Sequence, residues 1–115
     1  MRRPISPRVH GMIDYATVAT TAAVPRLMGF PRRAEQLCYA LAGGYGGLSS
    51  VTDYPLAVRR KVPFKMHGVA EAAVGAALPF MPWALGFAKH RPARNFVLGL
   101  TALTAVVAAL TDWNG

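Results

Sequence analysis

Two histidines, each followed four residues later by a carboxylate, are the residues of this sequence whose types and spacing could do chemistry. His10 precedes Asp14, and His67 precedes Glu71. On a helix, residues four apart lie on one face, so each histidine and its carboxylate would be neighbours. Imidazole nitrogens and carboxylate oxygens are ligands of transition metals, and two histidines could also be the axial ligands of a haem.

Three interpretations of these pairs remain open from the sequence. The pairs could bind a transition metal or, through His10 and His67, a haem; they could form a path for protons or ions; or they could be a buried polar network that joins helices. The single cysteine, Cys38, and the lack of a Cys-x-x-Cys-His motif give a cofactor site no further support. The sequence therefore favours a structural network with no cofactor, and keeps a metal or haem as the alternative.

Two further aspartates are expected in the same polar network. Asp53 and Asp112 follow the second and fourth apolar segments of the chain. The helix dipole disfavours a negative charge at a helix C-terminus. We therefore expect each aspartate to gain from a nearby Arg8, Lys65 or histidine.

The histidine and carboxylate pairs recur because the chain consists of two copies of one sequence repeat. The step from His10 to His67 is 57 residues, and the same step relates Arg8 to Lys65, Asp14 to Glu71, Pro25 to Pro82, and Gly29-Phe30 to Gly86-Phe87. A step of 59 relates Thr52-Asp53-Tyr54 to Thr111-Asp112-Trp113. Their constant order and spacing favour an internal repeat over chance similarity. We expect one membrane domain over residues 1–115, with repeats at about 8–54 and 65–113.

Composition predicts that the elements carrying these pairs lie in a membrane. Charged residues make up 16% of the chain and hydrophobic residues 53%, whereas a soluble domain carries about a quarter charged residues. The apolar segments fall at residues 9–28, 34–52, 66–87 and 93–111. A helix of about 20 residues just covers a hydrocarbon layer of about 30 Å, so each segment is a minimal span.

The expected fold is all-α, with four short transmembrane helices arranged as two parallel, tandemly repeated helical hairpins. Because each repeat crosses the membrane an even number of times, both repeats begin at the same surface, related by an axis along the membrane normal. His10 and His67 then lie at one depth, with the carboxylates one turn deeper. Pro79 and Pro82 should kink the third helix or end it early.

The second helix contains a small-x-x-x-small spacing at Gly43 and Gly47. Inside lipid, such glycines let helix backbones approach closely. The contact could lie within the hairpin or between two copies of the chain, and the sequence favours the internal contact.

The net charge of +8 does not point to a nucleic acid, because the basic residues are confined to the ends of the apolar segments. That distribution is typical of loops that face lipid headgroups. The expected partners are the lipid bilayer and other membrane helices or a second copy of the chain, with no nucleic acid. The basic first eight residues, without a signal-peptide pattern, favour a cytoplasmic N-terminus.

Several motifs along nearly the whole chain resemble one family. They are His10-Gly11-x-x-Asp14-Tyr15, Thr52-Asp53-Tyr54-Pro55-Leu56, Pro63-Phe64-Lys65-Met66-His67-Gly68 and Pro82-Trp83-Ala84-Leu85-Gly86-Phe87. Together they resemble the SPW repeat family of small bacterial integral membrane proteins. The resemblance implies paired helical hairpins in the bacterial inner membrane, and it implies no activity. This chain departs from the family at Met81, where the family has serine, and in its first repeat, which reads Val24-Pro25-Arg26 with no tryptophan.

We therefore expect a small integral membrane protein without a catalytic site, acting as a structural or accessory subunit or as a homo-oligomer. No Gly-x-Ser-x-Gly turn accompanies the serines, and no glycine-rich phosphate loop follows a strand. The alternatives are a redox protein with a metal or haem at His10, Asp14, His67 and Glu71, and a small proton or ion carrier.

Overall fold

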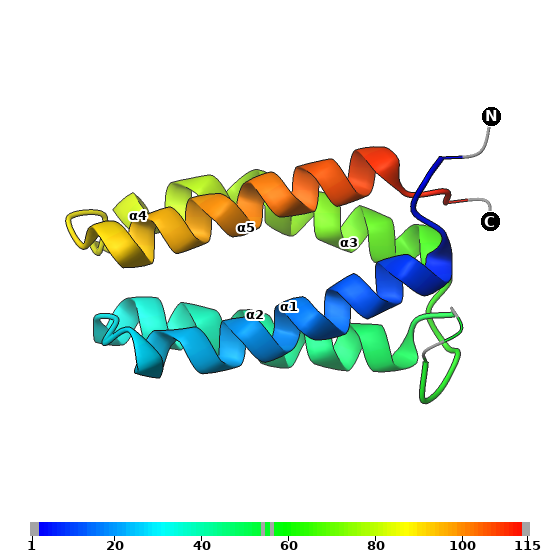
Figure 1. Ribbon diagram of the computed structural model, residues 1–115, viewed down its shortest axis with the longest axis horizontal. Helices are drawn as coiled ribbons and strands as arrows, with labels where there is room; N and C mark the ends of the chain where they lie inside the picture. The colour runs from blue at the N-terminus through cyan, green and yellow to red at the C-terminus, as the bar shows by residue number, and fades with distance from the viewer. Residues whose placement is uncertain (1–2, 54, 56, 114–115) are drawn as a thin grey trace.

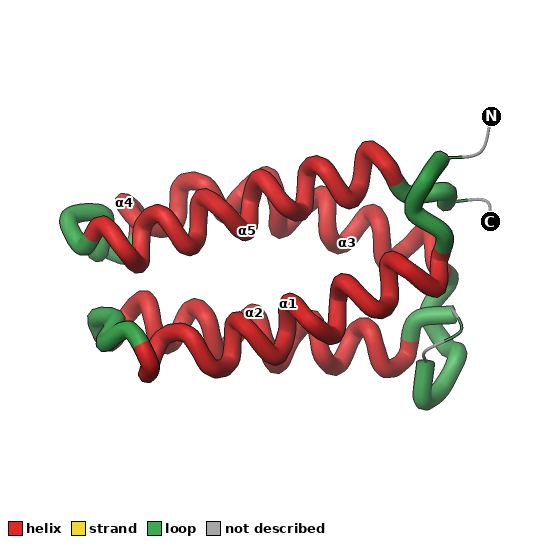
Figure 2. The backbone as a smooth tube through the Cα atoms, viewed as in Figure 1, coloured by secondary structure: helices red, strands yellow, loops and turns green. Residues whose placement is uncertain are grey.

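Helices make up nearly all the regular structure of the protein in the computed structural model (Figure 1). The structure describes residues 3–53, 55 and 57–113, so Tyr54 and Leu56 of the motif above lie outside the described residues. The elements are α1 (Pro7–Leu27), α2 (Arg32–Val51), α3 (Phe64–Ala77), a 3-10 turn η1 (Leu78–Phe80), α4 (Met81–Ala84) and α5 (Arg91–Leu110). Within the described residues there is no β-strand (Figure 2), so the expected all-α fold is confirmed.

Local sequence signals explain where α1 begins and ends. The Ser6 side chain accepts a hydrogen bond from the Val9 N–H at 3.2 Å and so caps the first turn. At the other end Gly29 has a φ of 62°, and the Phe30 N–H donates to the Pro25 carbonyl at 2.9 Å. Glycine adopts this left-handed conformation without steric cost, and the resulting turn satisfies carbonyls at the helix end.

The segment that runs from α3 through η1 to α4 ends in the same way as α1, but its α-helix is interrupted earlier. Gly86 has a φ of 78°, and the Phe87 N–H donates to the Pro82 carbonyl at 2.8 Å. Regular α-helix stops at Ala77 and changes to the 3-10 turn that contains Pro79. Proline lacks the N–H that would continue the helix, so the predicted interruption is confirmed.

The helices form two hairpins that lie side by side: α1 packs along α2, and α3 packs along α5 (Figure 1). An apolar core joins the hairpins at the end of the molecule away from the termini. Its buried residues are Phe30, Ala34, Cys38, Leu78, Phe87, Ala93 and Val97. Small residues spaced four apart on α2, at Ala34 and Cys38, allow this close packing, and Ala93 and Val97 of α5 are their counterparts at the step of 59 residues.

At the opposite end, each hairpin is tied to the other by a short backbone bridge. Ile5, just before α1, pairs with Thr111 after α5, and Val62, before α3, pairs with Thr52 after α2. Ile5 and Val62 are themselves related by the step of 57 residues. These bridges bring the start of one repeat beside the end of the other, so the N-terminal turns of α1 and α3 meet.

Several polar side chains are buried, and several large apolar side chains are exposed. The buried polar side chains are His10, Asp14, Thr21, Ser49, Thr52, His67, Glu71 and Thr111. The exposed large apolar side chains include Met12, Leu27, Val69, Phe80, Trp83 and Val106. The exposed surface of the described residues thus includes large apolar side chains, and the interior includes polar ones.

The glycines singled out in α2 do not make the expected internal contact. A Cβ atom added to Gly43 or Gly47 would meet nothing within 4 Å among the described residues, and both glycines are exposed. Gly46 is the α2 glycine that faces its hairpin partner, with Val18 Cγ1 at 3.4 Å from an added Cβ. Helix α2 packs through the face that carries Ala42 and Gly46, so the internal packing role predicted for Gly43 and Gly47 is wrong.

One helix in the described part of the chain, α5, is long and apolar enough by length and composition to cross a membrane. Its residues Arg91–Leu110 have a mean hydropathy of 1.7 over an 18-residue window.

The close approach between Gly68 and Trp113 predicts that Gly68→Ala destabilises the protein. An added Cβ would lie 2.8 Å from the Trp113 ring, which is held against His10 and Phe64. Such overpacking costs about 1–3 kcal/mol, against about 1 kcal/mol gained from replacing a helical glycine. Thermal unfolding in detergent, followed by circular dichroism, measures the difference.

Gly99→Ala is the matched control for this substitution. Gly99 lies in α5, and an added Cβ there meets nothing within 4 Å among the described residues. We expect Gly99→Ala to raise the unfolding temperature and Gly68→Ala to lower it. An equal rise for both would show that Trp113 does not pack as described.

Candidate functional site

The four residues predicted from the sequence to act together do meet in space. His10 and Asp14 of α1 and His67 and Glu71 of α3 are all buried, with Asp14 the most exposed at 7%. Each contributes one nitrogen or oxygen to a set in which no two atoms are more than 4.8 Å apart. We call these residues the His-carboxylate cluster.

Each histidine of the cluster faces both carboxylates through its Nε2 atom. His10 Nε2 lies 3.3 Å from Asp14 Oδ2 and 3.4 Å from Glu71 Oε2. His67 Nε2 lies 3.0 Å from Asp14 Oδ2 and 3.3 Å from Glu71 Oε1. The imidazole rings are 5.3 Å apart between centroids and nearly perpendicular, at 83°. The cluster is thus shared between the two hairpins.

Threonines that end the other two helices fix the far side of each imidazole. His10 Nδ1 lies 2.9 Å from Thr111 Oγ1, and His67 Nδ1 lies 2.8 Å from Thr52 Oγ1. The Thr111 hydroxyl donates to the Val107 carbonyl, and the Thr52 hydroxyl donates to the Leu48 carbonyl. A hydroxyl has a single proton, so each threonine oxygen must accept a hydrogen bond from the Nδ1–H of its histidine.

With Nδ1 protonated, the Nε2 atom of each histidine can be either protonated or unprotonated. If Nε2 also carries a proton, each histidine is a cation, and the two cations balance the two carboxylates. If Nε2 is unprotonated, its lone pair points between the carboxylates and can bind a metal. A metal-bound histidine characteristically donates its other ring N–H to a fixed acceptor, the role that Thr52 and Thr111 can play.

Two atoms of the cluster are buried without a hydrogen bond, namely His10 Nε2 and Glu71 Oε2, among the residues that the structure describes. They lie 3.4 Å from each other, which is close enough for an ion pair but outside good hydrogen-bond geometry. A buried polar atom without a hydrogen bond costs about 1–3 kcal/mol. The cluster as it stands therefore has unused binding capacity directed at its centre.

Aromatic rings close the cluster towards the end of the bundle that carries the termini. Phe64 and Trp113 lie 4.8 Å apart between ring centroids, and each packs against the His10 ring, at 5.3 and 5.1 Å. The Trp113 Nε1–H donates to the Ala108 carbonyl at 3.0 Å, which holds the indole in place. These rings limit the access of water to the histidines.

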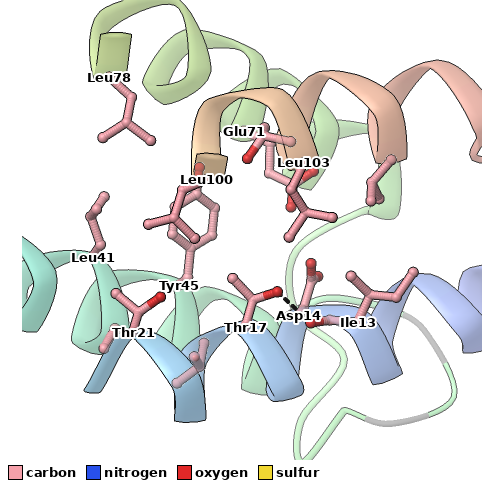
Figure 3. Close-up of a pocket in the computed structure, with 14 residues that line it drawn as sticks. Ile13, Asp14, Thr17, Thr21, Leu41, Tyr45, Glu71, Leu78, Leu100 and Leu103 are labelled. Atoms are coloured by element: carbon pink, nitrogen blue, oxygen red, sulfur yellow. Dashed lines mark hydrogen bonds between the residues drawn. The ribbon is translucent and has the colours of Figure 1, made fainter. Parts of the chain in front are cut away.

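A pocket lies on the other side of the cluster, between the hairpins. Asp14 and Glu71 form part of its wall, together with Tyr45 of α2 and apolar residues of α1, α2, η1 and α5. Figure 3 shows the two carboxylates at one end of this space, with Leu41 and Leu78 at the other. The cluster is thus accessible from within the bundle.

Of the two aspartates expected in the network, Asp53 lies outside the cluster, and the threonines before both aspartates contact the histidines. Asp53 is exposed, and its carboxylate lies 3.9 Å from Arg60 Nε, so it belongs to the surface loop and not to the cluster. Asp112 is half-buried, and its backbone N–H donates to the Ile5 carbonyl at 2.7 Å. The preceding residues, Thr52 and Thr111, reach the histidines. The sequence contained a signal for these histidine partners, because Thr52 and Thr111 match between the repeats just as Asp53 and Asp112 do.

No protein-family model, curated protein or solved structure matches this chain. The likeness to the SPW repeat family rests on the sequence motifs given above.

The threonine contacts predict that Thr111→Val and Thr52→Val each destabilise the fold. Valine keeps the size and branching of threonine but removes the oxygen that accepts from the buried histidine Nδ1–H. An unsatisfied buried donor costs about 1–3 kcal/mol, which thermal or denaturant unfolding in detergent would detect.

Thr20→Val is the control for this loss. Thr20 is exposed, and its hydroxyl bonds only to the Ala16 carbonyl of its own helix, at 2.8 Å. We expect it to change stability by less than about 0.5 kcal/mol, as surface substitutions usually do. If all three valine variants unfold alike, the threonines do not orient the histidines.

Proposed function

We propose that this chain is an integral membrane protein that holds one divalent transition-metal ion between its two helical hairpins. His10, Asp14, His67 and Glu71 are the proposed ligands. The main support for the proposal is the arrangement of the ligand-type atoms in the His-carboxylate cluster. The distances between these atoms resemble the distances between neighbouring ligand atoms around one metal ion.

The distances in the cluster support tetrahedral coordination. Three distances join one set of four ligand atoms: Asp14 Oδ2 lies 3.3 Å from His10 Nε2 and 3.0 Å from His67 Nε2, and Glu71 Oε1 lies 3.3 Å from His67 Nε2. The contact of His10 Nε2 with Glu71, at 3.4 Å, is to the other oxygen, Oε2. Metal–ligand bonds of about 2.0–2.1 Å in a tetrahedron place neighbouring ligand atoms about 3.3 Å apart. The widest separation, at most 4.8 Å, would shorten as the ion draws the ligands together.

Charge balance supports an ion of charge +2. Two unprotonated histidines and two carboxylates carry a net charge of −2, which a divalent ion neutralises. A neutral site is the form that a low-dielectric interior tolerates best. The ion would also give a partner to His10 Nε2 and Glu71 Oε2, two of the three buried side-chain atoms that make no hydrogen bond among the described residues.

The ligand types favour Zn²⁺, Fe²⁺ or Mn²⁺ over other occupants. Imidazole suits zinc and iron, while carboxylates extend the range to manganese, and a tetrahedral arrangement favours zinc. A haem between His10 and His67 is less compatible, because the porphyrin would have to displace Asp14 and Glu71 from the space between the two Nε2 atoms.

A membrane location is supported by the shape and surface of the bundle. The molecule measures 41 Å along its longest axis, and a bilayer with its headgroup regions is about 40–45 Å thick. Side chains such as Val69 and Val106 are exposed at 61% and 54%, and contact with lipid would bury them in an apolar environment. We propose that four helical segments, namely α1, α2, α3 together with η1 and α4, and α5, cross the membrane. They would form two parallel hairpins of the SPW repeat kind.

A structural role is the alternative, with the cluster as an ion-paired lock between hairpins in an accessory subunit. The distances of 3.0–3.4 Å also lie in the range of histidine–carboxylate ion pairs. A path for protons or ions is a weaker alternative, because the apolar core around Phe30 and Phe87 fills the opposite end of the bundle.

The metal proposal predicts that metal-depleted protein in detergent binds about one equivalent of Zn²⁺, and that His10→Ala and His67→Ala each abolish this binding. Calorimetry and elemental analysis measure the stoichiometry. Loading with Co²⁺ should give the intense visible absorption of a tetrahedral site. His90→Ala is the control, because His90 lies at the start of α5, where its Nδ1 accepts from the Ala93 N–H.

Zn²⁺ binding that is no tighter in the wild-type protein than in the double variant His10→Ala, His67→Ala would contradict the proposal. Melting curves of each variant, measured without metal, separate loss of ligands from loss of fold. A metal-free protein that nevertheless loses stability in both histidine variants would point to the ion-paired lock.

The membrane proposal predicts how a spin label at Val69 behaves. In a Cys38→Ala background, a label at Val69→Cys should be accessible to dissolved oxygen and shielded from a polar nickel reagent, since oxygen concentrates in lipid. Val58→Cys is the matched control, because Val58 lies 83% exposed in the loop beside Arg59. Paramagnetic relaxation in liposomes measures both. Equal access of the nickel reagent to the two sites would rule out lipid around α3.

A further inference from the structure

The pocket beside the His-carboxylate cluster is a feature that metal binding leaves unexplained. Its cavity volume is about 50 Å³, and the cavity is open on one side. A four-helix bundle that needed only an ion between its histidines would fill this space with side chains. Figure 3 shows it lying between the hairpins, between the ribbons of α1 and α2 on one side and those of α3 and α5 on the other.

The lining of the pocket changes from polar to apolar along its length. Asp14 and Glu71 form one end, with the Tyr45 side chain reaching in from α2. Leu41 and Leu78 form the opposite end, where the apolar core begins. Such a gradient suits an amphiphilic molecule with a small polar head and a hydrocarbon tail.

The pocket is reached from the side of the bundle. Helices α1 and α5 supply most of its wall, and Leu103 of α5 is 40% exposed although it lines the pocket. Ile13 and Thr17 of α1 are half-buried opposite it. In the proposed membrane setting this opening faces lipid, so a ligand would come from the bilayer and not from water.

We propose that the pocket binds a neutral lipophilic molecule with a hydroxyl head, such as a long-chain alcohol or an alkylated phenol, with the hydroxyl directed at Asp14 and Glu71. Carboxylate oxygens accept hydrogen bonds, and both Asp14 and Glu71 line the pocket. A fatty acid would bring a third negative charge to this end. A cationic head would meet a cluster whose carboxylates are already balanced by the histidines or by the ion.

This inference goes beyond the metal proposal and does not require an ion to be present. Each carboxylate has about four lone-pair sites, so Asp14 and Glu71 can bind an ion and still accept from a hydroxyl. The pocket would give a lipophilic molecule direct contact with the cluster, while Phe64 and Trp113 keep water from the other side.

The test is photolabelling in lipid nanodiscs with dodecanol that carries a diazirine in its tail. The expected adducts fall on peptides of α1 and α5 that contain Thr17, Leu100 and Leu103, and an excess of plain dodecanol removes them. Dodecanoic acid should compete several-fold less well, because its head is anionic. Adducts spread over outward-facing residues such as Met12 and Val106, unaffected by dodecanol, would overturn the proposal.

Substitution of two alanines, one in the pocket and one on the surface, shows whether the saturable labelling occurs in the pocket. Ala42 is buried and lines the pocket, so Ala42→Phe should fill it and lower the saturable labelling several-fold. Ala105→Phe is the matched control, because Ala105 is exposed on α5 outside the pocket, and it should label as the wild-type protein does. If Ala42→Phe fails to fold, Leu103→Trp at the mouth replaces it. Equal labelling in the pocket and control variants would overturn the proposal.

Running the labelling with and without Zn²⁺ distinguishes this inference from the metal proposal. Saturable labelling of the pocket in a protein that binds no Zn²⁺ would support the ligand and reject the ion. Stoichiometric Zn²⁺ binding without saturable labelling would reject the ligand and leave the ion.

Discussion

The structure depends on burying two carboxylates beside two histidines at the junction of its hairpins. An isolated carboxylate in an apolar interior costs several kcal/mol, so neither Asp14 nor Glu71 could be buried by its own hairpin without a compensating charge or ion. Each histidine contacts the carboxylate of its own helix and that of the other repeat, at 3.0–3.4 Å. Two of these four contacts, His10 with Glu71 and His67 with Asp14, cross between the hairpins, so they form only when the hairpins lie together as observed.

The internal repeat explains how a short chain assembles such a site. Two copies of one hairpin, placed around a common axis, bring every side chain near the axis close to its counterpart. The bridges of Ile5 with Thr111 and of Val62 with Thr52 hold the ends of the repeats together just above the histidines. A single His-x-x-x-carboxylate motif thereby becomes four ligand groups.

The sequence predicted the all-helical fold and the four cluster residues because both follow from periodicity. Spacing of four on a helix and the constant step between repeats require only regular helices. It did not predict the threonine partners, because which side chain reaches a histidine depends on how the last turn of α2 or α5 ends. The glycines of α2 were misjudged for a similar reason: Gly43 and Gly47 fit a packing motif, but the helix is rotated so that Gly46 faces α1. Spacing identifies a helix face, and only tertiary packing decides which face is buried.

Within the cluster and its threonine partners, the two repeats differ only at the carboxylates, and this difference bears on what the cluster can do. Asp14 contacts both histidines through the same oxygen, Oδ2, whereas Glu71 directs Oε2 to His10 and Oε1 to His67. The additional methylene of glutamate lets one carboxylate span both imidazoles, so the two halves bind the centre differently. Glu71 also supplies the carboxylate oxygen that makes no hydrogen bond among the described residues. Both carboxylates border the pocket, while the histidines are held by the threonines on the other side. The histidine side of the cluster therefore joins the hairpins, and the carboxylate side is the one that a ligand in the pocket would contact.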